Sequence, residues 1–290
     1  MVLRPSFPDE EIEKERGTQI AQIVKARDSM FTYPFILARR AAYGDHPYGL
    51  PASGYEDTVS ALTREQILDS YKGLVSADGA VIVVVGDVDT GAVLALLEDA
   101  FADLPKGRGK PAPPPRAGVA HGENVVERDK SQSAQAFAFP AVDVLSPDVP
   151  ALNILRNIAS GMGGRLYDEV REKRNLAYTV VAYLELHKQG GTILNYAATS
   201  PENETQARDL MIRQWNDMAG GDISETEFEN AKKYTLGIFQ IQLQSNADLR
   251  AQYARNVFME RGVEYVKTYP ELIRNTTLED VKRAAAAHAA

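Results

Sequence analysis

The sequence predicts an α+β fold built from two homologous lobes, each packing helices on an antiparallel or mixed sheet, with the first lobe incomplete. Three observations lead to this prediction. Runs with the 3.6-residue period of amphipathic helices alternate with short apolar runs typical of strands. A stretch rich in proline and glycine divides the chain. Segments before it also resemble segments near the carboxyl end, which indicates an internal repeat. The 290 residues, 44% of them hydrophobic, can form one large or two ordinary domains.

Residues 1–104 are expected to form the latter half of the first lobe. The helix predicted over 8–30 has Asp9, Glu10 and Glu11 in its first turn, where negative charge suits the helix dipole. Thr63-Arg64-Glu65-Gln66 is a capping box, which marks the start of another helix. The other elements expected here are helices over 34–43 and 90–104 and a buried strand over 80–87.

Residues 105–118 are predicted to be a linker between the lobes, because prolines and glycines crowd this stretch and proline disrupts both helices and central strands. Residues 119–290 are expected to form the second lobe. Its predicted strands cover 123–128, 133–140, 180–186 and 192–199, and its predicted helices cover 148–159, 205–218, 225–243, 247–261 and 277–289.

The two lobes are predicted to be copies of one unit. Val59–Ile67 is similar to Ile273–Val281, 214 residues further along, and Asp9–Arg16 is similar to Glu225–Lys232 at an offset of 216. At this spacing the counterpart of residues 119–222 would lie before residue 8. The first lobe is therefore expected to be incomplete, either because the chain is a fragment or because the missing part is supplied from elsewhere.

Composition excludes several classes of function. The formal net charge of −8 argues against a nucleic-acid or anionic-membrane surface. No apolar run approaches the roughly 20 residues that span a bilayer, so no transmembrane segment is expected. The chain has no cysteine, which rules out disulfides and thiolate metal sites and fits either the cytoplasm or the periplasm.

Arg171 and Tyr178 are the residues with the clearest candidate function. They lie seven positions apart, at the end of a short charged helix after Gly163-Gly164 and at the start of a β-prone run over 178–183. A fixed bend between helix and strand would bring the guanidinium and the phenol to one place. Both groups bind carbonyl oxygens, because arginine presents a rigid fork of N–H donors and tyrosine one hydroxyl. The alternative is an ordinary helix-to-strand junction with an exposed arginine.

The run from Gly163 to Val180 closely resembles the R-L-x-x-x-L-R-x-x-x-x-L-A-Y segment of the pitrilysin/insulinase family of zinc peptidases, the inverzincins. The resemblance implies a peptidase unit of two lobes. In that unit the arginine and tyrosine lie in the carboxy-terminal half and grip the backbone of a bound peptide, opposite the zinc site. It assigns substrate binding to Arg171 and Tyr178, and no catalytic residue to this chain.

The zinc site that the family builds is not complete in this chain. Its H-x-x-E-H motif needs two histidines on one helix face, with a glutamate between them as general base. None of the histidines stands four residues from another, so the motif is absent from this sequence; they are His46, His121, His187 and His288. In the family the motif lies upstream of the segment that this chain matches.

The third zinc ligand of the family is a glutamate seven residues after a glutamate in a Glu-Arg pair. Here that pair is Glu15-Arg16, and Gln22 stands in the ligand position. A neutral amide is a poor zinc ligand beside a carboxylate, because it brings no charge. No metal-binding residue is therefore predicted in this chain, and zinc is expected on a partner subunit or in a missing domain.

The resemblance thus implies a non-catalytic pitrilysin-family subunit or domain, inactive alone, that binds peptide substrate through Arg171 and Tyr178. It would complement a zinc-bearing subunit of the same family in metal-dependent proteolysis; a homodimer is the other expected assembly. Two alternatives remain open. The chain is a fragment of an active zinc metalloendopeptidase, or it is a structural subunit without peptide handling, as in the core subunits of the respiratory bc1 complex. Related bacterial pairs are often exported, which favours the periplasm, although the sequence does not determine the compartment.

Overall fold

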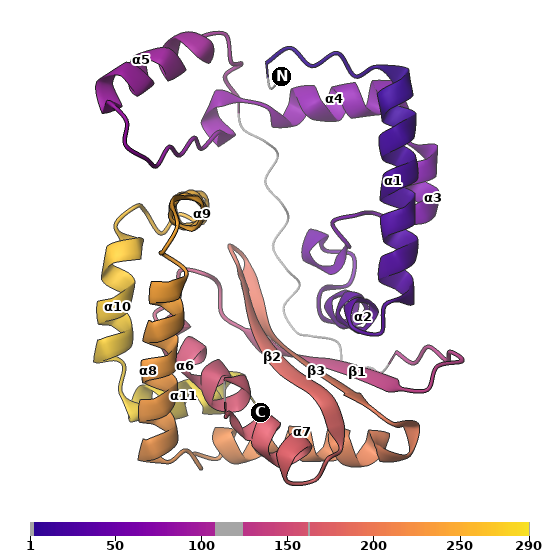
Figure 1. Cartoon of the computed structure of the whole chain (residues 1–290), viewed down its shortest axis with the longest axis vertical. Coiled ribbons are helices and arrows are strands. Elements are labelled where there is room, and N and C mark those ends of the chain that lie inside the picture. Colours follow the sequence, from indigo (N-terminus) through magenta and orange to yellow (C-terminus); the bar gives the residue numbers. More distant parts are fainter. Residues whose placement is uncertain (1–2, 108–123, 162, 290) are drawn as a thin grey trace.

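The computed structural model describes residues 3–107, 124–161 and 163–289, and it shows a helix-rich α+β protein with one small sheet (Figure 1). We call residues 3–104 the amino-terminal region and residues 124–289 the carboxy-terminal region. The expected linker, residues 105–118, lies mostly outside the described residues.

The sheet belongs to the carboxy-terminal region and has three antiparallel strands in the order β1-β3-β2. Its strands are β1 (Ser133–Ala141), β2 (Ala177–His187) and β3 (Gly190–Thr199). These match the strands predicted over 133–140, 180–186 and 192–199. The strand predicted over 123–128 does not form in the part that the structure describes, because residues 124–128 pair with no strand.

The central strand β3 is buried on both faces of the sheet. Ile193 and Ala197 point into the main core, where they meet the helices of the carboxy-terminal region. Leu194, Tyr196 and Ala198, which alternate with them, form a second core with an amino-terminal helix, α2 (Thr32–Tyr43). Because side chains alternate across a strand, β3 contributes to two cores at once.

The main core lies between the sheet and a set of helices. Its helices are α6 (Val149–Ser160), α7 (Glu204–Ala219), α8 (Glu225–Ile241), α9 (Asn246–Phe258), α10 (Tyr265–Asn275) and α11 (Leu278–His288). Figure 1 shows them on the side of the sheet away from α2. Trp215 is fully buried among them, and its indole Nε1 donates a hydrogen bond to Oδ1 of Asn195 on β3 over 2.7 Å. That bond satisfies two polar groups that burial would otherwise penalise.

Helix α10 is absent from the sequence-based prediction. Pro270 lies inside it, and proline removes a backbone N–H and normally ends or kinks a helix. Val266, Tyr269 and Ile273 nevertheless recur at helical spacing and are all buried. Burial of this apolar face outweighs the missing hydrogen bond.

The amino-terminal region is mainly helical and has little core of its own. Its helices are α1 (Asp9–Asp28), α2, α3 (Glu56–Ala61), α4 (Arg64–Leu74) and α5 (Thr90–Ala100), with short 3-10 turns at η1 (Pro47–Gly49) and η2 (Ala77–Gly79). Among its described residues, the buried apolar side chains are Ile23, Phe35 and Ala38. Two of these three contact the sheet of the other region.

The buried strand expected over 80–87 is wrong. This segment has no regular secondary structure and joins no ladder, and Val81, Ile82 and Val84 are 39, 47 and 50% exposed. The apolar, β-branched composition of this segment favours a strand. A strand also needs a neighbouring strand to satisfy its backbone groups. None of the described residues lies beside it as a strand.

Polar contacts also join α2 to the sheet. Arg39 binds the carboxylate of Glu185 on β2 through both Nε and Nη2, in the bidentate geometry that favours arginine. The Tyr196 hydroxyl donates to the Met30 carbonyl over 3.0 Å, next to the start of α2. Phe35 packs its ring 5.4 Å from that of Tyr196 and 5.6 Å from that of Tyr183.

A second ion pair fixes the turn that follows α6 to the start of α8. Arg165 donates to both carboxylate oxygens of Glu227 and to the backbone oxygen of Asp222. The Arg165 side chain is only 13% exposed. Its guanidinium, together with hydrogen bonds from Ser224, lowers the pKa of Glu227 from 4.5 to about 2, although partial burial opposes the shift.

We predict that Phe35→Ala lowers the free energy of unfolding by about 3 kcal/mol, because it leaves a cavity between α2 and the sheet. Leu96→Ala, at a side chain that is 67% exposed, is the control and should change stability by less than about 0.5 kcal/mol. Urea denaturation followed by circular dichroism measures both. Equal effects of the two substitutions would contradict the packing of α2 on the sheet.

We predict that Glu227→Gln lowers stability at pH 7 by about 1–2 kcal/mol, after allowance for solvent screening. The folded-state pKa lies below the unfolded value, so the contribution is present above pH 4.5 and is lost as the pH falls toward 2. The difference between wild type and variant should therefore shrink through that range. Glu229→Gln, two positions along α8, is the control. A difference that stays constant from pH 7 to pH 3 would refute the assignment.

Candidate functional site

The segment between α6 and β2 departs from regular geometry in a way that sets the direction of its side chains. Gly164 directly precedes the helical residues that start at Arg165, and a Cβ there would lie 2.8–2.9 Å from three backbone atoms, so only glycine fits. Residues Tyr167–Glu172 then form a π-helix, η3, a rare geometry often found at functional sites. Asn175 ends the segment with φ +48°, the left-handed conformation that asparagine tolerates better than most residues.

Tyr178 occupies a second irregularity. Ala177 pairs with Thr199 and Thr179 with Ala198, so the register of β2 shifts across Tyr178 and leaves it as the extra residue of a β-bulge. Bulges redirect side chains and are common beside active sites. Here the bulge leaves the Tyr178 side chain 76% exposed at the start of a strand.

Together the two irregularities bring Arg171 and Tyr178 side by side. The Arg171 guanidinium carbon lies 5.0 Å from the ring centroid of Tyr178 and 5.0 Å from that of Tyr167. The guanidinium is therefore in cation–π contact with both aromatic rings. Glu172 is close to it, with 3.6 Å between Nε and Oε1. The same glutamate raises the pKa of the Tyr167 hydroxyl by accepting its hydrogen bond.

Arg171 and Tyr178 line a hollow of about 660 Å³. Much of its remaining wall carries amides and hydroxyls, contributed by Gln132, Asn175, Thr199, Ser200 and Asn203. Guanidinium, phenol and amide groups can donate to carbonyl oxygens, and the amides can also accept from N–H groups. The hollow is thus suited chemically to a polypeptide backbone.

The three amide residues of this hollow were not predicted from the sequence. Asn175 carries one usable signal, since asparagine between a helix and a strand indicates a left-handed turn. Gln132 and Asn203 reach the hollow only through the pairing of β1 with β3 and the turn after β3, and no local pattern indicates this.

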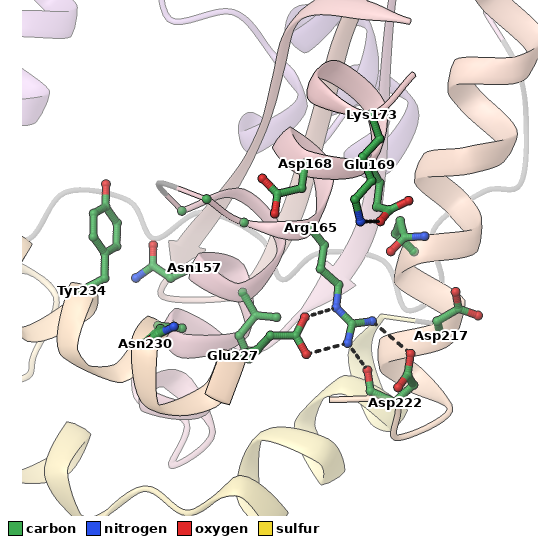
Figure 2. A pocket seen from close by; sticks show the side chains of 16 residues that line it. Asn157, Arg165, Asp168, Glu169, Lys173, Asp217, Asp222, Glu227, Asn230 and Tyr234 are labelled. Carbon is green, nitrogen blue, oxygen red and sulfur yellow. Dashed lines mark hydrogen bonds and ion pairs between the residues drawn. The ribbon is translucent and has the colours of Figure 1, made fainter. Parts of the chain in front are cut away.

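A second hollow, of about 590 Å³, lies on a different side of η3 and shares no lining residue with the first. Its walls come from α6, the turn after it, α7 and α8. Among its lining side chains, Figure 2 shows Arg165 bound to Glu227 and Asp222, and Lys173 bound to Glu169.

The described residues do not fit a zinc ion, because no three histidine, aspartate or glutamate side chains among them converge. Gln22, the predicted replacement for a ligand, is exposed on α1. His46 is buried, its Nδ1 accepts a hydrogen bond from the Tyr48 backbone, and its ring packs on Tyr48. No zinc chemistry is therefore assigned to these side chains.

His187 and His288 are also placed away from metal-ligand geometry. His187 stacks on Tyr48 at 4.1 Å, and burial lowers its pKa. His288 lies 3.6 Å from Asp148. His121 falls outside the described residues. Separately, none of the helices in the described part of the chain is long and apolar enough to span a bilayer.

Curated relatives match nearly the whole chain. It is 27% identical to an uncharacterized zinc protease of Mycobacterium tuberculosis, over 98% of this chain. It is 22% identical to a protein of Bacillus subtilis described as a probable inactive metalloprotease, over 96% of this chain. The chain spans 66% of the length of each relative.

A solved structure shares the fold. The peptidase M16 inactive domain from Pseudomonas fluorescens superposes with a TM-score of 0.89 at 24% identity, over 99% of this chain and 69% of that one. The family model described as the peptidase M16 inactive domain matches residues 61–235, which is more than half of the sequence. The chain therefore belongs to the peptidase M16 inactive-domain family.

Proposed function

We propose that this protein is a non-catalytic peptidase subunit or domain that binds the backbone of a peptide at Arg171 and Tyr178. In this proposal a zinc-bearing subunit of the same family, or a domain outside this chain, supplies the metal and the general base. The observation that carries it is the convergence of the two side chains in a polar hollow, produced by a π-helix and a β-bulge.

The geometry suits the proposed roles. Cation–π contacts with Tyr167 and Tyr178 hold the Arg171 guanidinium, and the N–H groups that do not face Glu172 can donate to peptide carbonyls. The side chain is 37% exposed, so a ligand can reach it. Tyr178 adds a hydroxyl donor, and near a scissile peptide such a donor would help to stabilise an oxyanion.

The assignment of zinc to a partner is supported by two features. The matching family model is described as an inactive domain, and Gln22 stands where the family resemblance places a carboxylate. The B. subtilis relative, described as a probable inactive metalloprotease, has a name consistent with this proposal.

We also infer that the amino-terminal region is one part of a lobe homologous to the carboxy-terminal region. Helices α4 and α11 are both eleven residues long, and each begins with a capping box, at Thr63 and Thr277. In the carboxy-terminal region α11 packs mainly against α6 and α7, which themselves lie on the sheet, whereas Leu74 on α4 is 69% exposed. A matching sheet would cover the apolar surface of the amino-terminal helices.

A second candidate is a piece of an active zinc metalloendopeptidase. The M. tuberculosis relative is described as a zinc protease and is longer than this chain. In that case the hollow and its Arg171/Tyr178 pair would act on peptide in the same way, while the zinc ligands would belong to another part of the same polypeptide.

We predict that Arg171→Ala lowers peptide cleavage by at least about tenfold when the purified chain is mixed with a zinc-bearing family member from the same cell, with Tyr178→Phe having a smaller effect. Arg213→Ala, at an exposed arginine on α7, is the control and should leave turnover unchanged. Cleavage of a quenched fluorescent peptide measures all three. Unchanged turnover in Arg171→Ala would contradict the proposed role of Arg171 in binding the peptide.

The same assay, with metal analysis of the purified chain, tests whether the zinc ligands lie outside these residues. A complementing subunit should show neither bound zinc nor activity alone, with activity appearing only in the mixture. Zinc bound stoichiometrically by the purified chain itself would contradict the assignment of the metal to a partner.

A further inference from the structure

The charge of the hollow beside Tyr178 is set by two residues that follow each other in the chain. Arg171 is the one cation among its described lining residues, and Glu172 is the one carboxylate. Nε of Arg171 lies 3.6 Å from Oε1 of Glu172. The hollow therefore presents a cation whose charge is already balanced, with uncharged amides and hydroxyls around it.

The geometry of η3 brings these two side chains together. In a regular α-helix, residues that follow each other directly do not face one another. In the π-helix Tyr167–Glu172, by contrast, Arg171 and Glu172 line the same hollow. Glu172 also accepts a hydrogen bond from the Tyr167 hydroxyl, which raises the pKa of that tyrosine. The carboxylate is thus held beside the guanidinium instead of turning away into solvent.

The basic residues that follow in the chain do not offset this carboxylate. Lys173 and Arg174 both bind Glu169, which does not line the hollow. Next to the wall there is more negative charge, because the exposed side chain of Glu202 lies two residues after Ser200, which lines it. A ligand therefore meets one positive group with negative groups around it.

A neutral group and a charged group meet this arrangement differently. A peptide carbonyl carries no net charge, so it can accept a hydrogen bond from Arg171 without being repelled by Glu172. A carboxylate is attracted by Arg171 but repelled by Glu172 at a similar distance. The strong charge-assisted bond that arginine normally forms with a carboxylate is thereby weakened, and like charges in a site disfavour the wrong partner.

We propose that Glu172 is a specificity-determining residue, which makes this site accept uncharged polypeptide backbone and reject a carboxylate. The inference rests on the peptide binding proposed above, and it adds which part of a peptide the site takes. Arg171 supplies the donors for the backbone, and Glu172 prevents the same donors from capturing the charged end of a chain.

The experiment uses the full 290-residue chain and two short peptides of uncharged residues. Both carry the same dye at the amino end, and they differ only in a carboxy-terminal amide or free acid. Fluorescence anisotropy at low ionic strength, where charges are weakly screened, measures both affinities. The acid should bind about threefold more weakly than the amide. Glu172→Gln should strengthen binding of the acid about three- to tenfold and change that of the amide by less than about twofold.

Glu98→Gln is the matched control, because it removes the same charge from an exposed glutamate on α5. It should change the binding of neither peptide. The Glu172 side chain is 54% exposed, so its substitution should leave the fold intact, and thermal unfolding checks this. An unchanged ratio of the two affinities in Glu172→Gln would overturn the proposal. An equal rise for both peptides would also overturn it, because a purely structural role of Glu172 would have that effect.

This proposal and the proposed function fail in different ways. Arg171→Ala should weaken the amide peptide, because it removes donors to the backbone. If it does so while Glu172→Gln leaves the ratio of the two affinities unchanged, backbone binding stands and selection by Glu172 is wrong. If Arg171→Ala leaves the amide peptide unchanged, backbone binding at this site is wrong, whatever Glu172→Gln does.

Discussion

The double burial of β3 is the constraint on which the rest of the structure depends. One set of its side chains meets the helices of the carboxy-terminal region, and the alternating set meets α2. Because the side-chain period of a strand is two, a slip of one residue would exchange these two faces. The register of β3 therefore positions the helical core and the amino-terminal region together, and it also places β2, on which Tyr178 lies.

The candidate site, unlike this regular sheet, is built from segments with irregular backbone geometry. A π-helix presents Arg171, a bulge presents Tyr178, and a left-handed asparagine closes the turn between them. Buried Val170 and Leu176 keep this irregular segment on the core. The framework is rigid where side chains interdigitate, and it tolerates unusual backbone geometry where function would use it.

Much of the fold follows from sequence pattern, because periodicity and capping are local. The three sheet strands and α6 to α9 were predicted close to their observed bounds, and so was α11, whose capping box lies in consecutive residues. Segment 80–87 was misassigned, since composition reveals β preference but not the presence of a neighbour. The pair of Arg165 with Glu227 joins residues 62 positions apart, so it is not visible before the chain is folded.

The exposed apolar segment 80–87 affects how newly made chains behave before they are fully assembled. A β-branched segment that pairs with no described strand leaves backbone hydrogen-bonding groups open to another chain. It carries acidic Asp87 at one end but no charge from Ala80 to Gly86, so nothing within the run repels a second copy. Until this segment is covered, it is the point at which newly made chains would pair wrongly with one another.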